Sequence, residues 1–129
     1  MKYSINHEEK YVLIRIEEDK LDSIQAPELK SAFLKLQSEG SNNVILDLSS
    51  VKYSDSSGLS ALLVGNRIFT ENGGVFILTG LNEHVKKLIS ISQLENVLYL
   101  LPTEHEAVEA VFMHELEKNL RDEAGEENE

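Results

Sequence analysis

The order of hydrophobic and polar positions along the chain predicts strands and helices in alternation. Short apolar runs rich in β-branched residues are typical of buried strands, and the chain contains them at residues 11–16, 44–48, 75–78 and 97–101. Tyr3-Ser4-Ile5 lies ahead of the first run, and we expect it to pair with that run through a turn at residues 7–10.

Apolar residues at three- and four-residue spacing predict a helix after each of these runs. The first helix has Asp22 or Ser23 as a suitable cap and Pro27 in its first turn, where proline is tolerated. The last helix begins with the capping-box pattern of Thr103 and Glu106. We expect this last helix to fray in the acidic tail and to turn the following residues inward: Val108, Val111, Phe112, Leu116 and Leu120.

The alternation of strands and helices also predicts the fold class, because it implies right-handed crossovers between neighbouring parallel strands. With 129 residues the chain has the usual size of one domain. We therefore predict a single α/β domain, with a mixed, mainly parallel sheet of about four to five strands and about four helices. We place this domain at residues 1–115 and assign residues 116–129 to the helix end and an acidic tail.

The amino-acid composition excludes or disfavours several classes of function for this protein. The chain has no cysteine, which excludes a disulfide scaffold, a thiol nucleophile and any cysteine-ligated metal site. A formal net charge of −11 disfavours binding to nucleic acid and to anionic membrane surfaces. No apolar run approaches the length of about 18 residues that a membrane span needs. These features predict a cytoplasmic protein.

Motifs for catalysis and metal binding are incomplete. His114-Glu115 begins a zincin pattern, but Lys118 stands where the second histidine is required. Gly73-Gly74 leads into a strand and not into a phosphate-binding helix, and no serine lies in a Gly-x-Ser-x-Gly elbow. Asp22, Asp47 and Asp55 show no local acid/base pairing. We therefore expect neither an enzyme nor a metal site.

The segment Tyr53-Ser54-Asp55-Ser56-Ser57-Gly58-Leu59 differs from the rest of the chain. Its simplest interpretation is a helix start, since Ser and Asp are preferred caps. A serine hydroxyl at that position would lie beside free backbone N–H groups and the positive end of the helix dipole, which suits a phosphate. Gly58 removes a side chain, and we expect this to let a partner protein approach closely.

The chain resembles the STAS family, named for sulphate transporters and anti-sigma factor antagonists, over residues 3–113. The resemblance rests on the strand Val44–Leu48, the motif Asp55-Ser56-Ser57-Gly58-Leu59, and the later helix and turn that contain Val85-Lys86-Lys87-Leu88 and Ile91–Leu94. It implies a small binding module of a partner-switching circuit.

In such a circuit the unphosphorylated antagonist binds an anti-sigma factor that is also a serine kinase, and a serine phosphatase reverses the phosphorylation. The resemblance implies phosphorylation at Ser57 and partner binding through Asp22, Asp55, Ser56, Ser57 and Gly58. The nucleotide and Mg²⁺ would belong to the kinase, so this chain needs no cofactor. A phosphate adds about −1.5 to −2 charges and would change the binding surface without refolding.

Two other classes of function stay open. One is a regulatory or structural STAS subunit of a larger assembly, such as a stressosome-like complex or a lipid-transport ATPase complex. The other, ranked third, is a small-ligand sensor or an enzyme, and fusion to an anion transporter is disfavoured by the absence of a membrane span. We expect the isolated chain to be a monomer.

Overall fold

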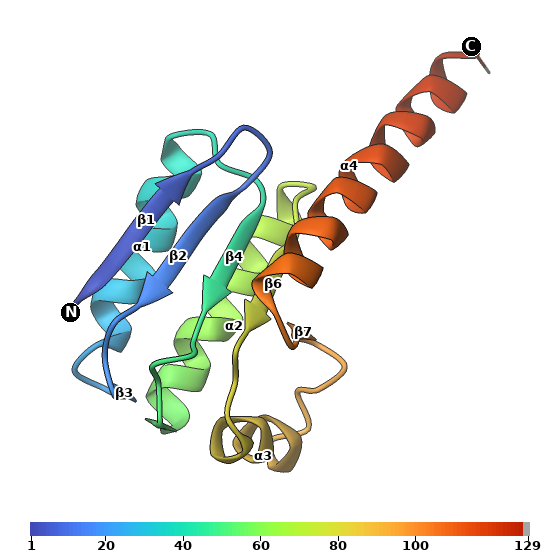
Figure 1. Cartoon of the computed structure of the whole chain (residues 1–129). Helices are drawn as coiled ribbons and strands as arrows, with labels where there is room; N and C mark the ends of the chain where they lie inside the picture. The colour runs from blue at the N-terminus through green and yellow to red at the C-terminus, as the bar shows by residue number, and fades with distance from the viewer. Residues whose placement is uncertain (128–129) are drawn as a thin grey trace.

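A mixed five-stranded sheet forms the centre of the computed structural model, which describes residues 1–127 (Figure 1). The first pair is antiparallel and the other pairs are parallel, which confirms the predicted sheet and the pairing of the first two strands. In spatial order the strands are β1 (Tyr3–His7), β2 (Val12–Ile16), β4 (Val44–Asp47), β6 (Phe76–Thr79) and β7 (Tyr99–Leu101).

Helices cover both faces of this sheet (Figure 1). The part of the chain that the structure describes contains four of them, as predicted: α1 (Ala26–Ser38), α2 (Ser56–Glu71), α3 (Glu83–Ile91) and α4 (Glu104–Glu127). The buried core divides in the same way, with a large cluster beneath α1, α2 and α3 and a smaller one beneath α4. None of the described helices is both long enough and apolar enough to traverse a lipid bilayer.

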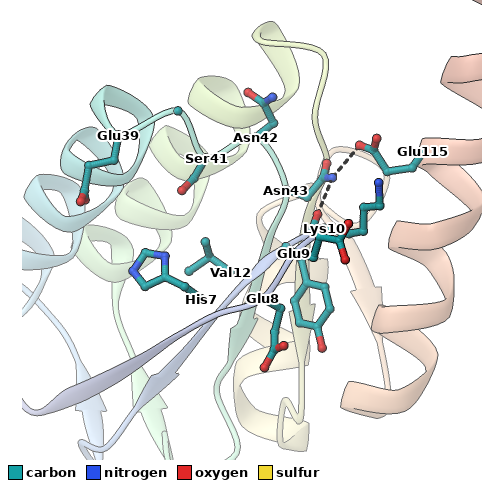
Figure 2. Close-up of a pocket in the computed structure, with 12 residues that line it drawn as sticks. His7, Glu8, Glu9, Lys10, Val12, Glu39, Ser41, Asn42, Asn43 and Glu115 are labelled. Atoms are coloured by element: carbon teal, nitrogen blue, oxygen red, sulfur yellow. Dashed lines mark hydrogen bonds between the residues drawn. The ribbon is translucent and has the colours of Figure 1, made fainter.

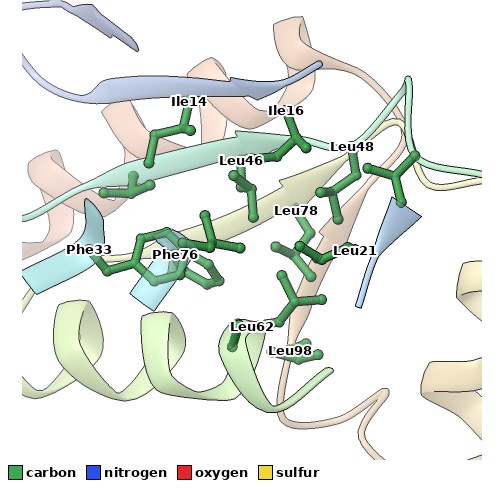
Figure 3. Close-up of a cluster of buried hydrophobic side chains, with 14 of the residues drawn as sticks. Ile14, Ile16, Leu21, Phe33, Leu46, Leu48, Leu62, Phe76, Leu78 and Leu98 are labelled. Atoms are coloured by element: carbon green, nitrogen blue, oxygen red, sulfur yellow. The ribbon is translucent and has the colours of Figure 1, made fainter. Parts of the chain in front are cut away.

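The alternating side chains of the parallel strands explain the division of the core. Ile14, Leu46 and Leu78 point into the large cluster, where they meet aromatic rings and leucines (Figure 3). The rings of Phe33 and Phe76 lie edge to face there, with centroids 5.3 Å apart. The residues one position earlier in each strand point to the other face and pack under α4: Leu13, Ile45 and Ile77.

A second sheet of two short parallel strands was not predicted. It consists of β3 (Lys20–Leu21) and β5 (Tyr53–Ser54), which pair in parallel. Two-residue strands are too short to show a hydrophobic period, so their pattern is indistinguishable from that of a loop. Leu21 is nevertheless only 1% exposed, because this small sheet closes one end of the large cluster.

The prediction for the last helix was wrong in two respects. Val111 is buried as expected and Val108 is partly buried, but three of the residues expected inward are half-exposed: Phe112 (50%), Leu116 (53%) and Leu120 (56%). The helix also does not fray where the acidic residues begin, and α4 continues unbroken to Glu127. The domain limit proposed at residue 115 therefore falls inside a continuous helix.

Candidate functional site

Ser57 lies in the first turn of α2, and Asp55 caps that helix. One carboxylate oxygen of Asp55, Oδ1, accepts hydrogen bonds from the backbone N–H groups of Ser57 (2.9 Å) and Gly58 (3.1 Å). The backbone of Asp55 is extended, as is usual for an N-cap residue. The motif therefore starts a helix, as its composition predicts, with the aspartate as the cap.

This cap corrects part of the sequence interpretation. We expected free N–H groups beside the serine hydroxyl, ready to bind a phosphate. Two of the amide groups at the start of α2 are instead taken by Asp55. A phosphate on Ser57 would consequently be added next to an existing carboxylate, and not into an empty anion site.

The hydroxyl of Ser57 keeps some contact with solvent, although the residue as a whole is half-buried. It makes no hydrogen bond within the described residues, and no buried side-chain oxygen or nitrogen among them lacks a partner, so this oxygen is not fully buried. Ser54 differs, because it is only 3% exposed and its hydroxyl donates to the carbonyl oxygen of Leu21 (2.8 Å). Ser56 is exposed at the tip of the turn. Of these three serines, Ser56 and Ser57 are placed to meet another protein.

Gly58 has a different role from the one we expected. Its missing side chain does not open space for a partner, because its Cα faces the protein interior. A Cβ placed there would lie 2.1 Å from the carbonyl oxygen of Leu21 and 2.3 Å from the hydroxyl oxygen of Ser54. Glycine is required here so that α2 can begin directly against the small sheet.

Asp22 reaches the same end of the molecule through that sheet. Leu21 pairs with Ser54, so Asp22 and Asp55 follow matching positions of neighbouring parallel strands. The carboxylate of Asp22 accepts from the N–H of Ile24 (2.9 Å) in the turn before α1. The prediction that Asp22 or Ser23 caps α1 is therefore wrong. Gln25 stands at that position without a side-chain cap bond, and Pro27 occupies the first turn as predicted.

The structure thus gathers all five predicted site residues at one end of the domain, which we call the switch pole: Asp22, Asp55, Ser56, Ser57 and Gly58. It also adds apolar and aromatic side chains that the sequence analysis did not select. Ile24 is 77% exposed in the turn next to Asp22. Tyr53 of β5 stacks on His84 of α3, with ring centroids 5.5 Å apart. An isoleucine within a polar turn was the one signal that could have been noticed.

A charge network anchors α4 to the sheet. Arg15 of β2 donates to Asp47 at the end of β4 and to Glu104 in the first turn of α4, each at 2.9 Å. Burial alone would raise the pKa of Asp47, but hydrogen bonds from Arg15 and Ser49 and the positive charge of Arg15 together hold it below its ordinary value. Asp47 therefore stays ionised and acts as a structural anchor.

A polar pocket of about 320 Å³ lies at the opposite end of the sheet, where β2 and β4 begin. Asn43 is buried beside it and donates to the carbonyl oxygen of Lys10 and to Glu115 (Figure 2). Its side-chain oxygen accepts from the N–H of Val75. Every polar atom of the Asn43 side chain is thus used to join elements of this protein. The described residues hold no group of three or more metal-ligating side chains, in this pocket or elsewhere.

Sequence comparison relates the chain to known proteins. The family model of the STAS domain matches residues 2–107. The anti-sigma-B factor antagonist of Staphylococcus epidermidis is 26% identical over 80 residues, which span 62% of this chain and 74% of that protein.

Solved structures show the same fold. An anti-sigma factor antagonist from Mycobacterium paratuberculosis superimposes with a TM-score of 0.76 at 21% identity, over 85% of this chain and 92% of that one. The phosphorylated form of the Bacillus cell fate determinant SpoIIAA does so with a TM-score of 0.68 at 21% identity, over 85% of this chain and 99% of that one. Since the family model of the STAS domain matches most of the length of this chain, the chain belongs to the STAS domain family.

Proposed function

We propose that this chain is an anti-sigma factor antagonist that is switched by phosphorylation of Ser57. In its unphosphorylated form it binds an anti-sigma factor, which is also its serine kinase, and so releases a sigma factor. A serine phosphatase restores the binding form. Relatives that are anti-sigma factor antagonists support the general role, and the phosphorylated form of SpoIIAA shows that this fold accommodates the modification in that protein.

The observation that carries the proposal is that the hydroxyl of Ser57, at a capped helix start, is unbonded within the described residues and not fully buried. Because Asp55 caps α2, the backbone at Ser57 is held in one conformation, and a kinase meets a preformed site. Ser54 fits this role less well, since its hydroxyl is buried and bonded to Leu21.

Binding in this proposal uses the residues of the switch pole other than the buried Gly58, together with the exposed Ile24 and the Tyr53–His84 stack. Aromatic and apolar side chains surrounded by polar groups are typical of protein interfaces. The acidic chain acts through protein partners in the cytoplasm and performs no catalysis itself, and nucleic acid stays an unsuitable partner at a net charge of −11.

Electrostatics alone suffices for the switch. At an effective dielectric constant of about 20, two unit charges about 4 Å apart repel by roughly 4 kcal/mol. A phosphate on Ser57 adds about −1.5 to −2 charges beside Asp55 and faces any acidic group of the partner. If about 3 kcal/mol of this repulsion survives relaxation, binding weakens more than about a hundredfold. No refolding is needed.

The phosphorylation site is tested by incubating the purified chain with a cognate anti-sigma factor kinase and ATP, followed by intact-mass measurement. We expect one added phosphate, which Ser57→Ala abolishes and the neighbouring Ser56→Ala retains. An unmodified chain in the presence of a kinase that demonstrably binds it would refute the phosphorylation switch.

The consequence for binding is tested with Ser57→Asp in a titration calorimeter. We expect a loss of affinity for the anti-sigma factor of more than about a hundredfold. Ser31→Asp is the matched control, because it adds the same charge on the exposed side of α1. If Ser57→Asp binds as tightly as Ser31→Asp, the chain is better described as a constitutive subunit of a larger STAS-containing assembly.

A further inference from the structure

The outward face of α4 carries an apolar stripe that the fold leaves uncovered. Phe112, Met113, Leu116 and Leu120 are each between 50% and 56% exposed. With successive residues about 100° apart around a helix, these four fall within a sector of about 100°. They form one continuous surface, which we call the α4 stripe.

The protein cannot cover this stripe with its own core, because the opposite side of α4 is already attached. Ala107 and Val111 are buried against the sheet. Further along, Nε2 of His114 lies 2.9 Å from the carbonyl oxygen of Gly73, and Glu115 accepts from Asn43 at 2.7 Å. These contacts fix the rotation of the helix about its axis, so the stripe faces away from the domain.

The far turns of α4 also lack the packing that normally maintains a helix. Figure 1 shows this helix extending well past the sheet, with its final turns clear of the other elements. The part of α4 beyond Glu115 is about twelve residues long, and an unpacked helix that short is marginal in water, because helices in proteins owe most of their stability to burial of an apolar face. Covering the α4 stripe would supply that burial.

The charges around the stripe indicate what covers it. Glu109 and Glu123 lie on the same side of the helix at its two ends, and Glu117 borders it. His105 is paired with Glu109 at 2.9 Å. Among the described side chains, the bases of this half of the helix lie outside the stripe: Lys118 beside Gly73, and Arg121 on a flank of the helix. The surface is therefore apolar with an acidic border.

We propose that the α4 stripe docks a basic amphipathic helix of a partner protein. Apolar side chains of such a helix would pack on Phe112, Met113, Leu116 and Leu120, and its lysines or arginines would lie against the acidic border. A second copy of this chain is the poorer occupant, because it would bring two acidic borders together in a protein of net charge −11. Figure 1 shows α4 extending away from the end of the domain at which β3 lies, so this surface is separate from the switch pole.

The full chain is tested against two labelled synthetic peptides by fluorescence anisotropy. Both form amphipathic helices of about three heptads with leucine at the core positions, and they differ only in having lysine or glutamate at the bordering positions. We expect the lysine peptide to bind, the glutamate peptide to bind at least about tenfold more weakly, and the difference to shrink at high salt. Equal binding of the two peptides, or binding of neither, would overturn the proposal.

Variants locate the surface. Leu116→Gln should weaken binding of the lysine peptide at least about tenfold, since it removes the central apolar contact. Leu34→Gln is the control, because Leu34 is 55% exposed on α1, close to the 53% of Leu116. Both variants change exposed side chains, and circular dichroism checks that the fold is kept. Unchanged binding by Leu116→Gln would refute the site.

Light scattering over a range of protein concentrations tests whether a second copy of this chain covers the α4 stripe instead. We expect the chain to stay monomeric on its own. A dimer that Leu116→Gln dissociates and Leu34→Gln does not would show that a second copy covers the stripe, and would overturn the basic-helix proposal. Neither the peptide binding nor the oligomeric state depends on Ser57. The proposal of a docking surface on α4 and the proposal of a phosphorylation switch can therefore fail independently.

Discussion

The carboxylate of Asp55 holds the backbone of Ser57, with Oδ1 2.9 Å from the serine nitrogen. The residue that begins α2 therefore also positions the proposed phosphorylation site. The cap orders the backbone at Ser57 and leaves the hydroxyl of this half-buried residue unbonded within the described residues.

Replacing this cap should reduce stability by a predictable amount. Asp55→Ala removes the acceptor for two backbone N–H groups, and we expect a loss of about 1 kcal/mol in the free energy of unfolding. Asp55→Asn keeps an acceptor oxygen and should lose less. Urea denaturation measures both, and Ser56→Ala, at an exposed neighbouring position, should stay within about 0.5 kcal/mol of the parent.

Gly58→Ala should destabilise the protein although alanine favours helices. The new methyl group would meet the carbonyl oxygen of Leu21 at 2.1 Å, and overpacking of this kind costs about 1–3 kcal/mol. Gly125→Ala provides the contrast, because nothing lies within 4 Å of a Cβ at that position of α4. There we expect no loss and a gain of up to about 1 kcal/mol. Equal effects in urea denaturation would contradict the internal contact at Gly58.

The ion pair of Arg15 and Asp47 should make stability depend on pH. Since the folded-state pKa of Asp47 lies below its ordinary value of 3.8, the pair stabilises the fold above that value. The contribution disappears as pH falls through the lower folded-state pKa. Because Arg15 is 39% exposed and solvent screens the pair, we expect Asp47→Asn to cost only about 1 kcal/mol at pH 7.

The measurement for this prediction is denaturant unfolding of the parent and Asp47→Asn from pH 7 down to about pH 2. The two stabilities should converge at the acid end, where the parent has lost the same charge. Glu104→Gln, which removes the more exposed partner of Arg15, should have a smaller effect throughout. A difference between parent and Asp47→Asn that does not change with pH would show that shape, and not charge, is responsible.

Asn43 should be the most sensitive polar residue at the end of the sheet opposite the switch pole. Asn43→Ala leaves the N–H of Val75 and the carbonyl oxygen of Lys10 without the side-chain bonds that the asparagine provides. We expect a loss of about 2–3 kcal/mol in urea denaturation. The exposed neighbour Asn42→Ala should change stability by less than about 0.5 kcal/mol. A similar loss in both variants would point to a general effect on the turn.

The spacing of hydrophobic residues along the sequence was sufficient to predict most of the strands and helices. Val44–Leu48 is buried on both faces, so its continuous apolar run has no other stable interpretation. The prediction for the last helix failed because this helix carries two apolar faces, with Val111 toward the sheet and Leu116 away from it. Spacing along one helix cannot show which of two apolar faces meets the core.

The position of the candidate site was predicted from the sequence, but the roles of the helix-start N–H groups and of Gly58 were predicted wrongly. Asp55 and Ser57 are close in sequence, so helix-cap chemistry alone brings them together. The role of Gly58 depends on Leu21, which is distant in sequence and becomes a neighbour only through the small sheet. The stack of Tyr53 on His84 likewise joins two elements, and no local pattern indicates it.

The cap formed by Asp55 has a last consequence, for how readily the proposed modification could be erased. Because Asp55 already engages two of the amides at the start of α2, a phosphoryl group on Ser57 would find fewer backbone donors there and would stay largely in water. An ester kept in water is within reach of a hydrolase without any prior opening of the protein. The same aspartate that orders the helix would thus keep the chemical mark short-lived and reusable.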